Sequence, residues 1–183
     1  MTKRELTKEL VKLNQTIVEL KEELNKIKSK DSVDNDSNEL IYSQNKLSLD
    51  NNTPDNILHI LALTDVIPIR CNVAKNTNTN VDTLILLSED ENINVLTHVA
   101  ENINTPIDIL IKLSKHCDWQ VRSSVATNNN TPLEILEVLV DDTDYYVRQQ
   151  VALNPKTTKD ILIKLSNDSN KNVKSIAFER LNK

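Results

Sequence analysis

Three histidines and two cysteines are the side chains of this sequence best suited to nucleophilic or metal chemistry. His59, His98 and His116 fall at three different positions of a 26-residue repeat, and no Ser/His/Asp set recurs. The chain has neither the His-x-x-x-His nor the Cys-x-x-Cys spacing of zinc sites. His116, Cys117 and Asp118 are consecutive, and adjacent side chains seldom converge on one ion. We therefore expect no catalytic residue, no bound metal and no cofactor.

Composition excludes further classes of protein. The 183 residues include no glycine, which the backbone turns of phosphate-binding loops and many β-hairpins need. Hydrophobic residues make up 38% of the chain but aromatic residues only 3%, so any core must be aliphatic. Cys71 and Cys117 lie two repeats apart, roughly 20 Å at the spacing of packed helices, too far for a disulfide within one chain. Two free thiols suit a reducing compartment.

Charge is distributed unevenly along the chain. The formal net charge is −5. Residues 1–30 carry eight Lys or Arg against five Glu (+3), and residues 31–183 carry fourteen against twenty-two acids (−8). This balance disfavours nucleic acid as a partner. No stretch approaches the ~18 apolar residues of a membrane helix, so we expect no membrane segment and a cytoplasmic protein, or one associated with a virion.

A 26-residue repeat dominates residues 50–179. Five blocks align without a gap, namely 50–75, 76–101, 102–127, 128–153 and 154–179. Every block has Thr at its fourth position, and Leu follows at the ninth and twelfth positions. β-Branched residues occupy the twentieth position, from Ile69 to Val173, and the twenty-fourth holds Val73, Val99, Val125, Val151 and Ala177. Ala follows this Val in the first four blocks. These columns predict two buried helix faces in each repeat.

The start of each predicted helix carries a recognisable signal. Thr followed by Pro, as in Thr131-Pro132, indicates an N-cap with Pro at the first helical position, and an acid three residues after the Thr has capping-box spacing. We expect a first helix of about ten residues and a second that begins after Asp118 or Asp144. Helices this short need stacked neighbours, so the sequence predicts an all-α fold, a short right-handed α-solenoid of two-helix repeats.

The motifs resemble a known family. Thr131–Leu139 (TPLEILEVL) and Val147–Ala152 (VRQQVA) look like the HEAT-like and leucine-rich-repeat-variant α-solenoids of bacteria. The resemblance covers about 70% of the chain and implies a binding scaffold without fixing a partner. The period is shorter than the ~40–47 residues of HEAT repeats, so second helices that are short and partly 3₁₀ are expected from the variant family. The cysteine cluster known beside some variant repeats has no counterpart here.

Residues 1–30 predict a coiled-coil helix. Apolar residues recur at alternating spacings of four and three, which is a heptad stripe. The stripe consists of Leu6, Leu10, Leu13, Ile17, Leu20, Leu24 and Ile27. Glu23 of one strand faces Lys28 of a parallel partner, so we expect a parallel homo-oligomer, dimer or trimer. The alternatives are a helix that folds back on its own solenoid and a helix that pairs with another protein.

Two short segments connect this helix to the repeats. Residues 31–38 (DSVDNDSN) are polar and acidic, and we expect a flexible linker. Residues 39–49 resemble the second helix of a preceding repeat, with Leu47 in the Val column and Ser48 in the Ala column. They are predicted to cap the N-terminal end of a solenoid that covers 39–183. Residues after 179 are predicted to cap its C-terminal end.

The outward side of the second helices is the predicted partner-binding surface. Its polar side chains can both donate and accept hydrogen bonds to a peptide backbone, and aromatic residues are frequent at interface hot spots. An ordinary solvated face is the alternative, and Trp119 and Tyr145 can instead be residues that fix the helix starts. The predicted partner-binding residues are Asn94, His98, Trp119, Gln120, Ser124, Tyr146, Gln150 and Asn172.

A column of cations precedes the second buried Val of each repeat. It holds Arg70, Arg122, Arg148 and Lys174, with Leu96 in the second repeat. Planar Arg suits bidentate pairing with carboxylates. We expect a structural ladder in which each Arg binds loop acids such as Asp118, Asp142 or Asp144, rather than a ladder that binds anions.

These features together predict a non-catalytic adaptor. We expect a scaffold that is oligomerised by its N-terminal helix and binds a protein or peptide on the solenoid face, since several copies raise avidity. A structural component of a larger assembly, such as a viral or phage particle, is the alternative. A nucleic-acid-binding solenoid is a weaker alternative because of the negative charge.

Overall fold

The computed structural model describes residues 33–182. Within this range it contains eleven α-helices, α2 to α12, and no β-strand, which confirms the all-α prediction. The chain divides into two compact units, residues 1–43 and 44–183. The predicted coiled coil of residues 1–30 lies outside the described residues. No helix in the described part is long and apolar enough to cross a membrane.

Helix α2 (Val33–Leu49) crosses the boundary between the two units. In the first unit its residues 40–42 have exposed side chains. The helix begins inside the range 31–38 that we predicted to be a flexible linker, so that prediction is wrong from Val33 onward. The physical reason is that each residue added to an existing helix gains a backbone hydrogen bond, which lets polar residues extend it.

The second unit contains ten further helices in two alternating sets. The shorter set has seven residues each and comprises α3 (Asp55–Leu61), α5 (Val81–Leu87), α7 (Ile107–Leu113), α9 (Leu133–Leu139) and α11 (Lys159–Leu165). The longer set comprises α4 (Ile67–Lys75), α6 (Ile93–Glu101), α8 (Trp119–Thr127), α10 (Tyr145–Leu153) and α12 (Lys171–Leu181). The second helices are therefore regular α-helices and the longer of each pair, not short 3₁₀ segments.

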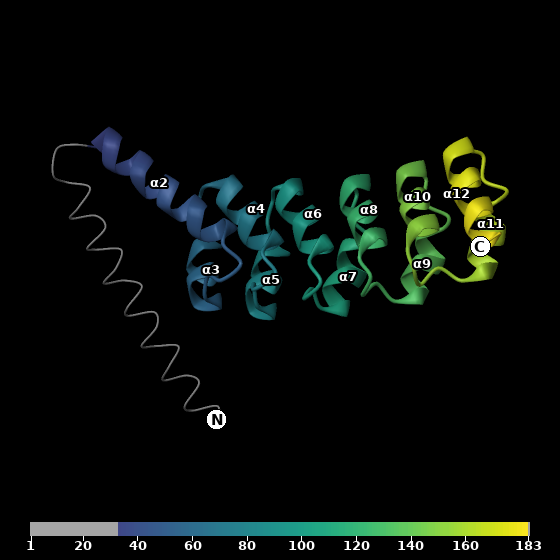
Figure 1. Ribbon diagram of the computed structural model, residues 1–183, viewed down its shortest axis with the longest axis horizontal. Coiled ribbons are helices and arrows are strands. Elements are labelled where there is room, and N and C mark those ends of the chain that lie inside the picture. Colours follow the sequence, from purple (N-terminus) through teal and green to yellow (C-terminus); the bar gives the residue numbers. More distant parts are fainter. Residues whose placement is uncertain (1–32, 183) are drawn as a thin grey trace, which may run out of the picture. The chain divides into compact units, whose positions relative to one another are not determined.

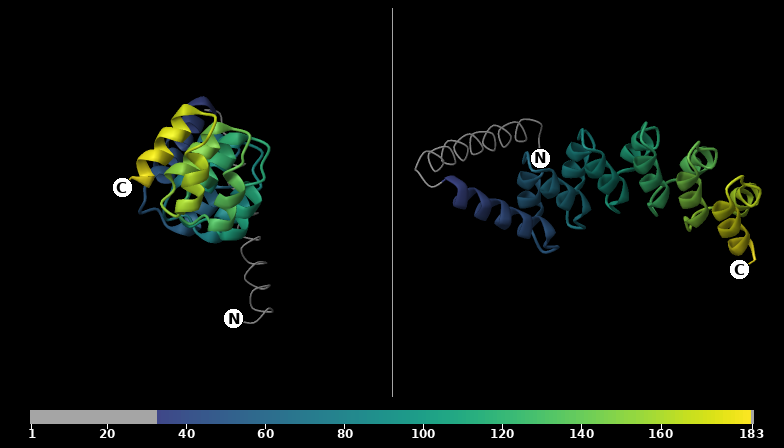
Figure 2. Two further views of the ribbon diagram at one scale, coloured as in Figure 1. Left: turned by 90° about the vertical axis from the view of Figure 1, so that its right-hand side faces the viewer. Right: turned by 90° about the horizontal axis from the view of Figure 1, so that it is seen from above.

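The two sets form two parallel rows. The even-numbered helices from α4 to α12 lie along one row and the odd-numbered helices from α3 to α11 along the other (Figure 1). Each even-numbered helix packs on the next one in its row. Viewed along the array, successive pairs lie one behind another (Figure 2). The predicted stack of two-helix repeats is confirmed.

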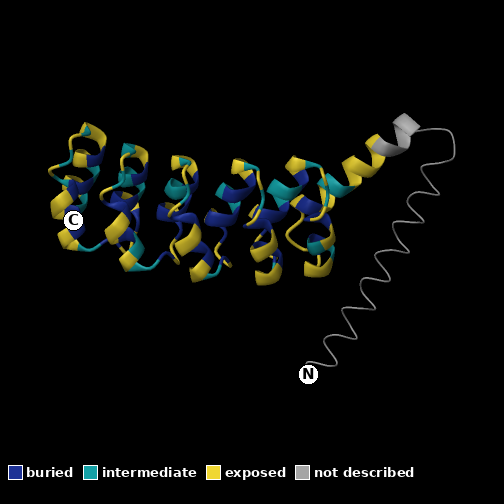
Figure 3. Cartoon of the chain, turned by 180° about the vertical axis from the view of Figure 1, so that it is seen from behind, coloured by how far each residue is buried: buried dark blue, intermediate teal, exposed yellow. Residues whose placement is uncertain are grey.

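The predicted aliphatic columns form the core. All five residues of each β-branched or Val column, from Ile69 to Val173 and from Val73 to Ala177, are fully buried. Buried positions face the interior of the array (Figure 3). Phe178, which breaks the Ala column, is 63% exposed. Ile176 and Leu181 pack against the core at this end instead.

The start of the first helices differs from the prediction. The Thr residues at the fourth position of the repeats are buried. Each hydroxyl donates to the carbonyl oxygen six residues earlier, as Thr79 does to Val73 (2.6 Å) and Thr131 to Val125 (2.6 Å). The N-cap is the next residue, for example Asn80 or Pro132, and no capping-box bond forms within residues 33–182. Each of these carbonyl oxygens also accepts a backbone N–H at the helix end, as Val73 does from Asn76, and a carbonyl oxygen has a second lone pair for the Thr hydroxyl. The first helices are consequently seven residues long rather than ten.

Candidate interaction surface of the second helices

Buried asparagines fix the spacing of successive repeats. Asn102 donates through Nδ2 to the carbonyl oxygens of Ala74 (2.7 Å) and Asn76 (3.0 Å), and its Oδ1 accepts the N–H of Asn104 (2.9 Å). Equivalent bonds recur at every block boundary, at Asn76, Asn102, Asn128 and Asn154. We call these four residues the asparagine ladder. Local sequence patterns do not indicate this role, because the carbonyl partners lie 26 and 28 residues away.

Arg180 closes the asparagine ladder at its C-terminal end. It occupies the position 26 residues after Asn154, and its Nη1 donates to the carbonyl oxygens of Ala152 (2.6 Å) and Asn154 (2.7 Å). Asn182 donates to the carbonyl oxygen of Phe178 (2.8 Å). Within residues 33–182 every buried side-chain nitrogen or oxygen has a hydrogen-bond partner. The ladder therefore holds backbone to backbone and offers no donor to a ligand.

Three arginines each join their own repeat to the next one. Arg122 binds Asp142 through Nε (2.6 Å) and Nη2 (2.8 Å), and its Nη1 donates to the carbonyl oxygens of His116 and Cys117. Arg70 pairs in the same way with Asp90, and Arg148 pairs with Asp168. Asp118 and Asp144, the other acids that we proposed, cap α8 and α10 instead.

These pairs change the pKa of both partners. The hydrogen bond from Arg148 lowers the pKa of Asp168, against the opposing effect of burial. Burial alone would raise the pKa of Asp142, but the hydrogen bonds from Arg122 and the N–H of Asp144 lower it overall. Because both guanidinium edges are occupied, these arginines are not available to bind an external anion.

The arginine column has one gap, and the partner column has a matching one. The second repeat has Leu96, which is buried, in place of Arg, and the third repeat has His116 where its neighbours have Asp. His116 Nδ1 still accepts the N–H of Asp118 (3.0 Å), as the aspartates accept the equivalent N–H. Lys174, the fourth predicted member, forms no ion pair within residues 33–182.

The predicted partner-binding residues divide by exposure. Asn94, Gln120 and Asn172 are exposed, and His98 and Gln150 are half-buried. Ser124 was expected to face outward but is 7% exposed, so its assignment to the surface is wrong. Helix α8 packs on α6 closely enough for Ser124 Oγ to donate to Glu101 Oε1 at 3.2 Å.

Glu101 lies between a histidine and a serine without forming a catalytic triad. His98 Nδ1 is 3.2 Å from Glu101 Oε2, and Ser124 Oγ is 3.2 Å from Glu101 Oε1. The hydrogen bond from His98 lowers the pKa of Glu101. A triad requires the serine to bind the histidine so that the ring accepts its proton. Here both side chains bind the carboxylate, so the arrangement does not activate the serine.

Three aromatic residues gather at the starts of α8 and α10. Trp119 and Tyr146 stack with ring centroids 5.1 Å apart and an interplanar angle of 21°, and Tyr145 contacts Tyr146 at 4.2 Å. Trp119 is 37% and Tyr146 43% exposed. We call these three residues the aromatic cluster. The structure brings Trp119 and Tyr146 together from different repeats, which the sequence analysis did not foresee.

A surface hollow of about 460 Å³ lies between the loops of the third and fourth repeats. His116, Cys117, Arg122, Asp141 and Asp142 are among its lining residues. Among residues 33–182 no three His, Cys, Asp or Glu side chains are positioned to hold a metal ion. Cys117 is exposed, whereas burial raises the pKa of the half-buried Cys71 thiol.

The outer side of the first helices carries apolar residues that sequence reasoning missed. The exposed ones on α3, α5, α7, α9 and α11 are Ile60, Val81, Ile85, Leu86, Ile107, Ile111, Val138 and Ile163. Two cross-repeat ion pairs, Lys112 with Glu89 (2.5 Å) and Lys164 with Asp141 (2.6 Å), lie among them. Lys112 and Lys164 occupy the same repeat position as Ile60, Leu86 and Val138, so this one column of the first helices is not apolar throughout.

Part of the chain matches the model of a known repeat family. The family model described as leucine rich repeat variant matches residues 119–144, a span equal to one 26-residue period. This span runs from α8 through α9 to the cap of α10. The predicted resemblance to helical-repeat solenoids of this kind is therefore confirmed. No curated protein matches the chain.

Two solved structures are similar to the chain. One is described as a leucine-rich repeat variant with a novel repetitive protein structural motif, at 20% identity and a TM-score of 0.43, covering 75% of this chain and 65% of that one. The chain thus spans less than two thirds of that relative's length. The other is a designed armadillo repeat protein, at 17% identity and a TM-score of 0.45, covering 83% of this chain and 95% of that one.

Proposed function

We propose that this protein is a non-catalytic interaction scaffold that binds a peptide or protein segment on the exposed side of its second helices. The observation that carries the proposal is the contrast between two sets of polar residues. The hydrogen-bond donors of the asparagine ladder and of the paired arginines bind groups of neighbouring repeats. Asn94, Gln120 and Asn172 form no side-chain hydrogen bond within residues 33–182 and occupy the same position of three repeats, a position that Tyr146 holds in the fourth.

This spacing suits an extended partner. Carboxamide side chains can donate to a backbone carbonyl and accept from a backbone N–H at the same time. The amides on α6, α8 and α12 offer such groups on three helices of one row, with Tyr146 at the same position of α10 (Figure 1). Trp119 and Tyr146 add exposed aromatic area to the same row, and aromatic residues carry much of the free energy at interfaces.

A non-catalytic role agrees with where the reactive groups lie. His59 Nδ1 lies 2.8 Å from Thr83 Oγ1, His98 contacts Glu101, and His116 accepts a backbone N–H. The three histidines thus lie in three different repeats, and each has its own hydrogen-bond partner. No two of them share a hydrogen-bond partner among the described residues.

Selection from a random peptide library on the full chain tests the scaffold. We expect peptides that bind the wild-type protein and lose at least about tenfold in affinity for Gln120→Ala/Gln150→Ala. The control, Asp108→Ala/Glu137→Ala on the first helices, should change affinity less than about twofold. A selection that yields no binder, or binders indifferent to the second-helix changes, would contradict the proposal.

We also propose that residues 1–30 oligomerise the scaffold. Light scattering of the full chain should give a dimer or trimer, and Leu13→Asp/Leu20→Asp should give a monomer because charge is introduced into the heptad core. Gln15→Asp, on the opposite side of the helix in the heptad, is the control and should leave the mass unchanged. A monomeric wild-type chain would refute self-association and remove the avidity argument.

A further inference from the structure

The aromatic cluster is built by two repeats and repeated by none of the others. The Trp119 position holds Ile in the first two repeats, and the Tyr146 position holds Pro68 in the first repeat and Asn94, Gln120 and Asn172 in the others. Since those repeats pack with the same buried columns, folding does not require an aromatic ring at the Tyr146 position. A stacked Trp–Tyr pair that remains more than a third exposed presents aromatic surface to solvent.

Two carboxylates without ion pairs flank the aromatic cluster. Asp118 directly precedes Trp119 and accepts the N–H of Gln120 (2.7 Å), and Asp144 precedes Tyr145 and accepts the N–H of Tyr146 (2.8 Å). Each uses one carboxylate oxygen in this way. Neither forms an ion pair within residues 33–182.

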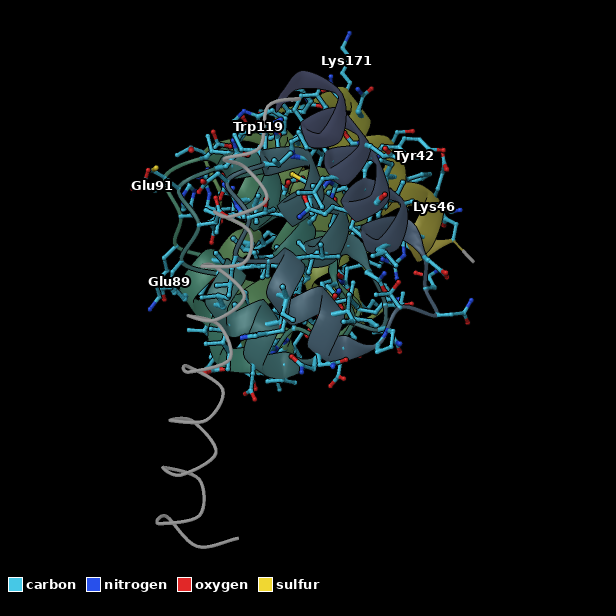
Figure 4. The ribbon with its side chains drawn as sticks, turned by 90° about the vertical axis from the view of Figure 1, so that its left-hand side faces the viewer. Tyr42, Lys46, Glu89, Glu91, Trp119 and Lys171 are labelled. Atoms are coloured by element: carbon cyan, nitrogen blue, oxygen red, sulfur yellow. The ribbon has the colours of Figure 1, made fainter. Side chains whose placement is uncertain are left out.

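The surrounding charge favours a cation at this place. The loops 114–118 and 140–144 carry four Asp and one Lys. Asp141 and Asp142 are neutralised by Lys164 and Arg122, which leaves Asp118 and Asp144 against Lys115. Glu91 lies along the same edge as Trp119 in the end-on view of Figure 4, is exposed, and forms no ion pair in the described part of the chain.

We propose that Trp119 and Tyr146, with Asp118 and Asp144 beside them, bind an arginine side chain of an extended partner segment. This inference rests on the proposed function and names the chemistry of the partner. A guanidinium stacks on the face of an aromatic ring and donates two parallel hydrogen bonds to a carboxylate. An acidic segment or a nucleic-acid phosphate would instead meet unpaired carboxylates.

Arginine fits this surface better than lysine. The planar guanidinium is more weakly hydrated than an ammonium group, so it leaves water for an aromatic face at lower cost. Lysine carries the same charge but cannot stack in a plane or bind a carboxylate with two parallel N–H groups. The surface therefore discriminates between the two cations, whereas a diffuse negative field does not.

Fluorescence anisotropy of labelled peptides on the full chain tests the proposal. The probes alternate Ser with Arg, with Lys or with Glu. We expect the Arg peptide to bind more tightly than the Lys peptide, and the Glu peptide not to bind. Trp119 is the single Trp of the chain, so its fluorescence should change on addition of the Arg peptide.

Variants borrowed from other repeats preserve the fold. Asp118→Asn and Asp144→Asn keep the cap, since Asn92 and Asn170 cap α6 and α12. Each should weaken binding of the Arg peptide about threefold to fivefold. Trp119→Ile and Tyr146→Asn copy the second repeat and should each weaken it about fivefold.

The charge-matched control is Asp82→Asn/Asp108→Asn, which removes two acids from first helices and should change the affinity less than twofold. Arg and Lys peptides that bind equally, or an affinity that falls as much in the control, would show a diffuse field and overturn the inference. An oligouridine probe that competes at Trp119 would overturn it too. Library-selected peptides that need Tyr146 for binding but contain no Arg would contradict arginine recognition and still support the proposed interaction scaffold. A selection that yields no binder would contradict the proposed scaffold.

Discussion

Replacing one buried asparagine should show how much the asparagine ladder contributes to the free energy of unfolding, apart from helix packing. Asn128 is 4% exposed and donates to the carbonyl oxygens of Ala100 (2.7 Å) and Asn102 (2.9 Å). The Asn102 oxygen also accepts the N–H of Thr105, so it keeps a partner in Asn128→Ala. The carbonyl oxygen of Ala100, at the end of α6, loses Asn128 Nδ2 as its hydrogen-bond donor.

The magnitude follows from these contacts. A buried carbonyl left without a donor costs about 1–3 kcal/mol. The N–H of Asn130, which binds Asn128 Oδ1 at 2.7 Å, loses its acceptor too, but Asn130 is exposed and water can replace it. We therefore expect Asn128→Ala to lower the free energy of unfolding by about 1–3 kcal/mol. Asn129→Ala is the control, because Asn129 is exposed and forms no hydrogen bond through its side chain among the described residues.

A second substitution at the same site tests the donor specifically. Asn128→Asp retains an oxygen for the N–H of Asn130 but brings a carboxylate against two carbonyl oxygens. It should be more destabilising than Asn128→Ala at pH 7. The introduced carboxyl has a higher pKa folded than unfolded, so part of the stability should return as the pH falls through the folded pKa and the group gains an O–H donor.

Urea unfolding of the full chain, followed by circular dichroism, measures these differences. The two asparagine variants should unfold at lower urea than the wild type with similar slopes. The reasoning would be refuted if Asn128→Ala matched Asn129→Ala within about 0.5 kcal/mol. It would equally be refuted if Asn128→Asp were as stable as Asn128→Ala at neutral pH.

Two further predictions concern the arginine pairs. The pKa of Asp168 is lower in the folded protein than the unfolded value of about 3.9, so the ionised carboxylate stabilises the fold at pH values above that unfolded value. This stabilisation is lost as the pH falls through the folded pKa. Arg148→Leu should therefore reduce the loss of stability in acid, measured by thermal unfolding from neutral pH to pH 2. At the gap in the arginine column, Leu96→Arg and His116→Asp should each destabilise the protein when introduced alone. The double variant should recover at least about 1 kcal/mol in a double-mutant cycle. Strictly additive effects would contradict the inferred pairing.

Particular residues show what the sequence was able to predict. The Leu columns through Leu58 and Leu61 and the Val columns through Ile69 and Val73 recur at helical spacing, and all are buried as predicted. Hydrophobic burial depends on the residue type at each position, and the period of 26 repeats it in every block. The all-α repeat fold and the caps of α8 and α10 follow from this local information.

Polar residues were harder to assign because their partners lie one repeat away. Thr131 has the signals of an N-cap but donates backward to Val125, and Ser124 has an outward-facing register but packs against Glu101. A hydroxyl or an amide is compatible with water, a cap or a neighbouring backbone. Local spacing does not distinguish these three environments.

The sequence by itself determined the repeat, its aliphatic core and the order of its helices. Only the tertiary structure decided that Asn128 binds the preceding repeat, that Arg122 pairs with Asp142, and that Trp119 stacks on Tyr146. These contacts join residues 20 to 28 positions apart. Such contacts depend on the distance and rotation between stacked repeats, which are set by how closely the buried Ala and Val side chains let the second helices approach.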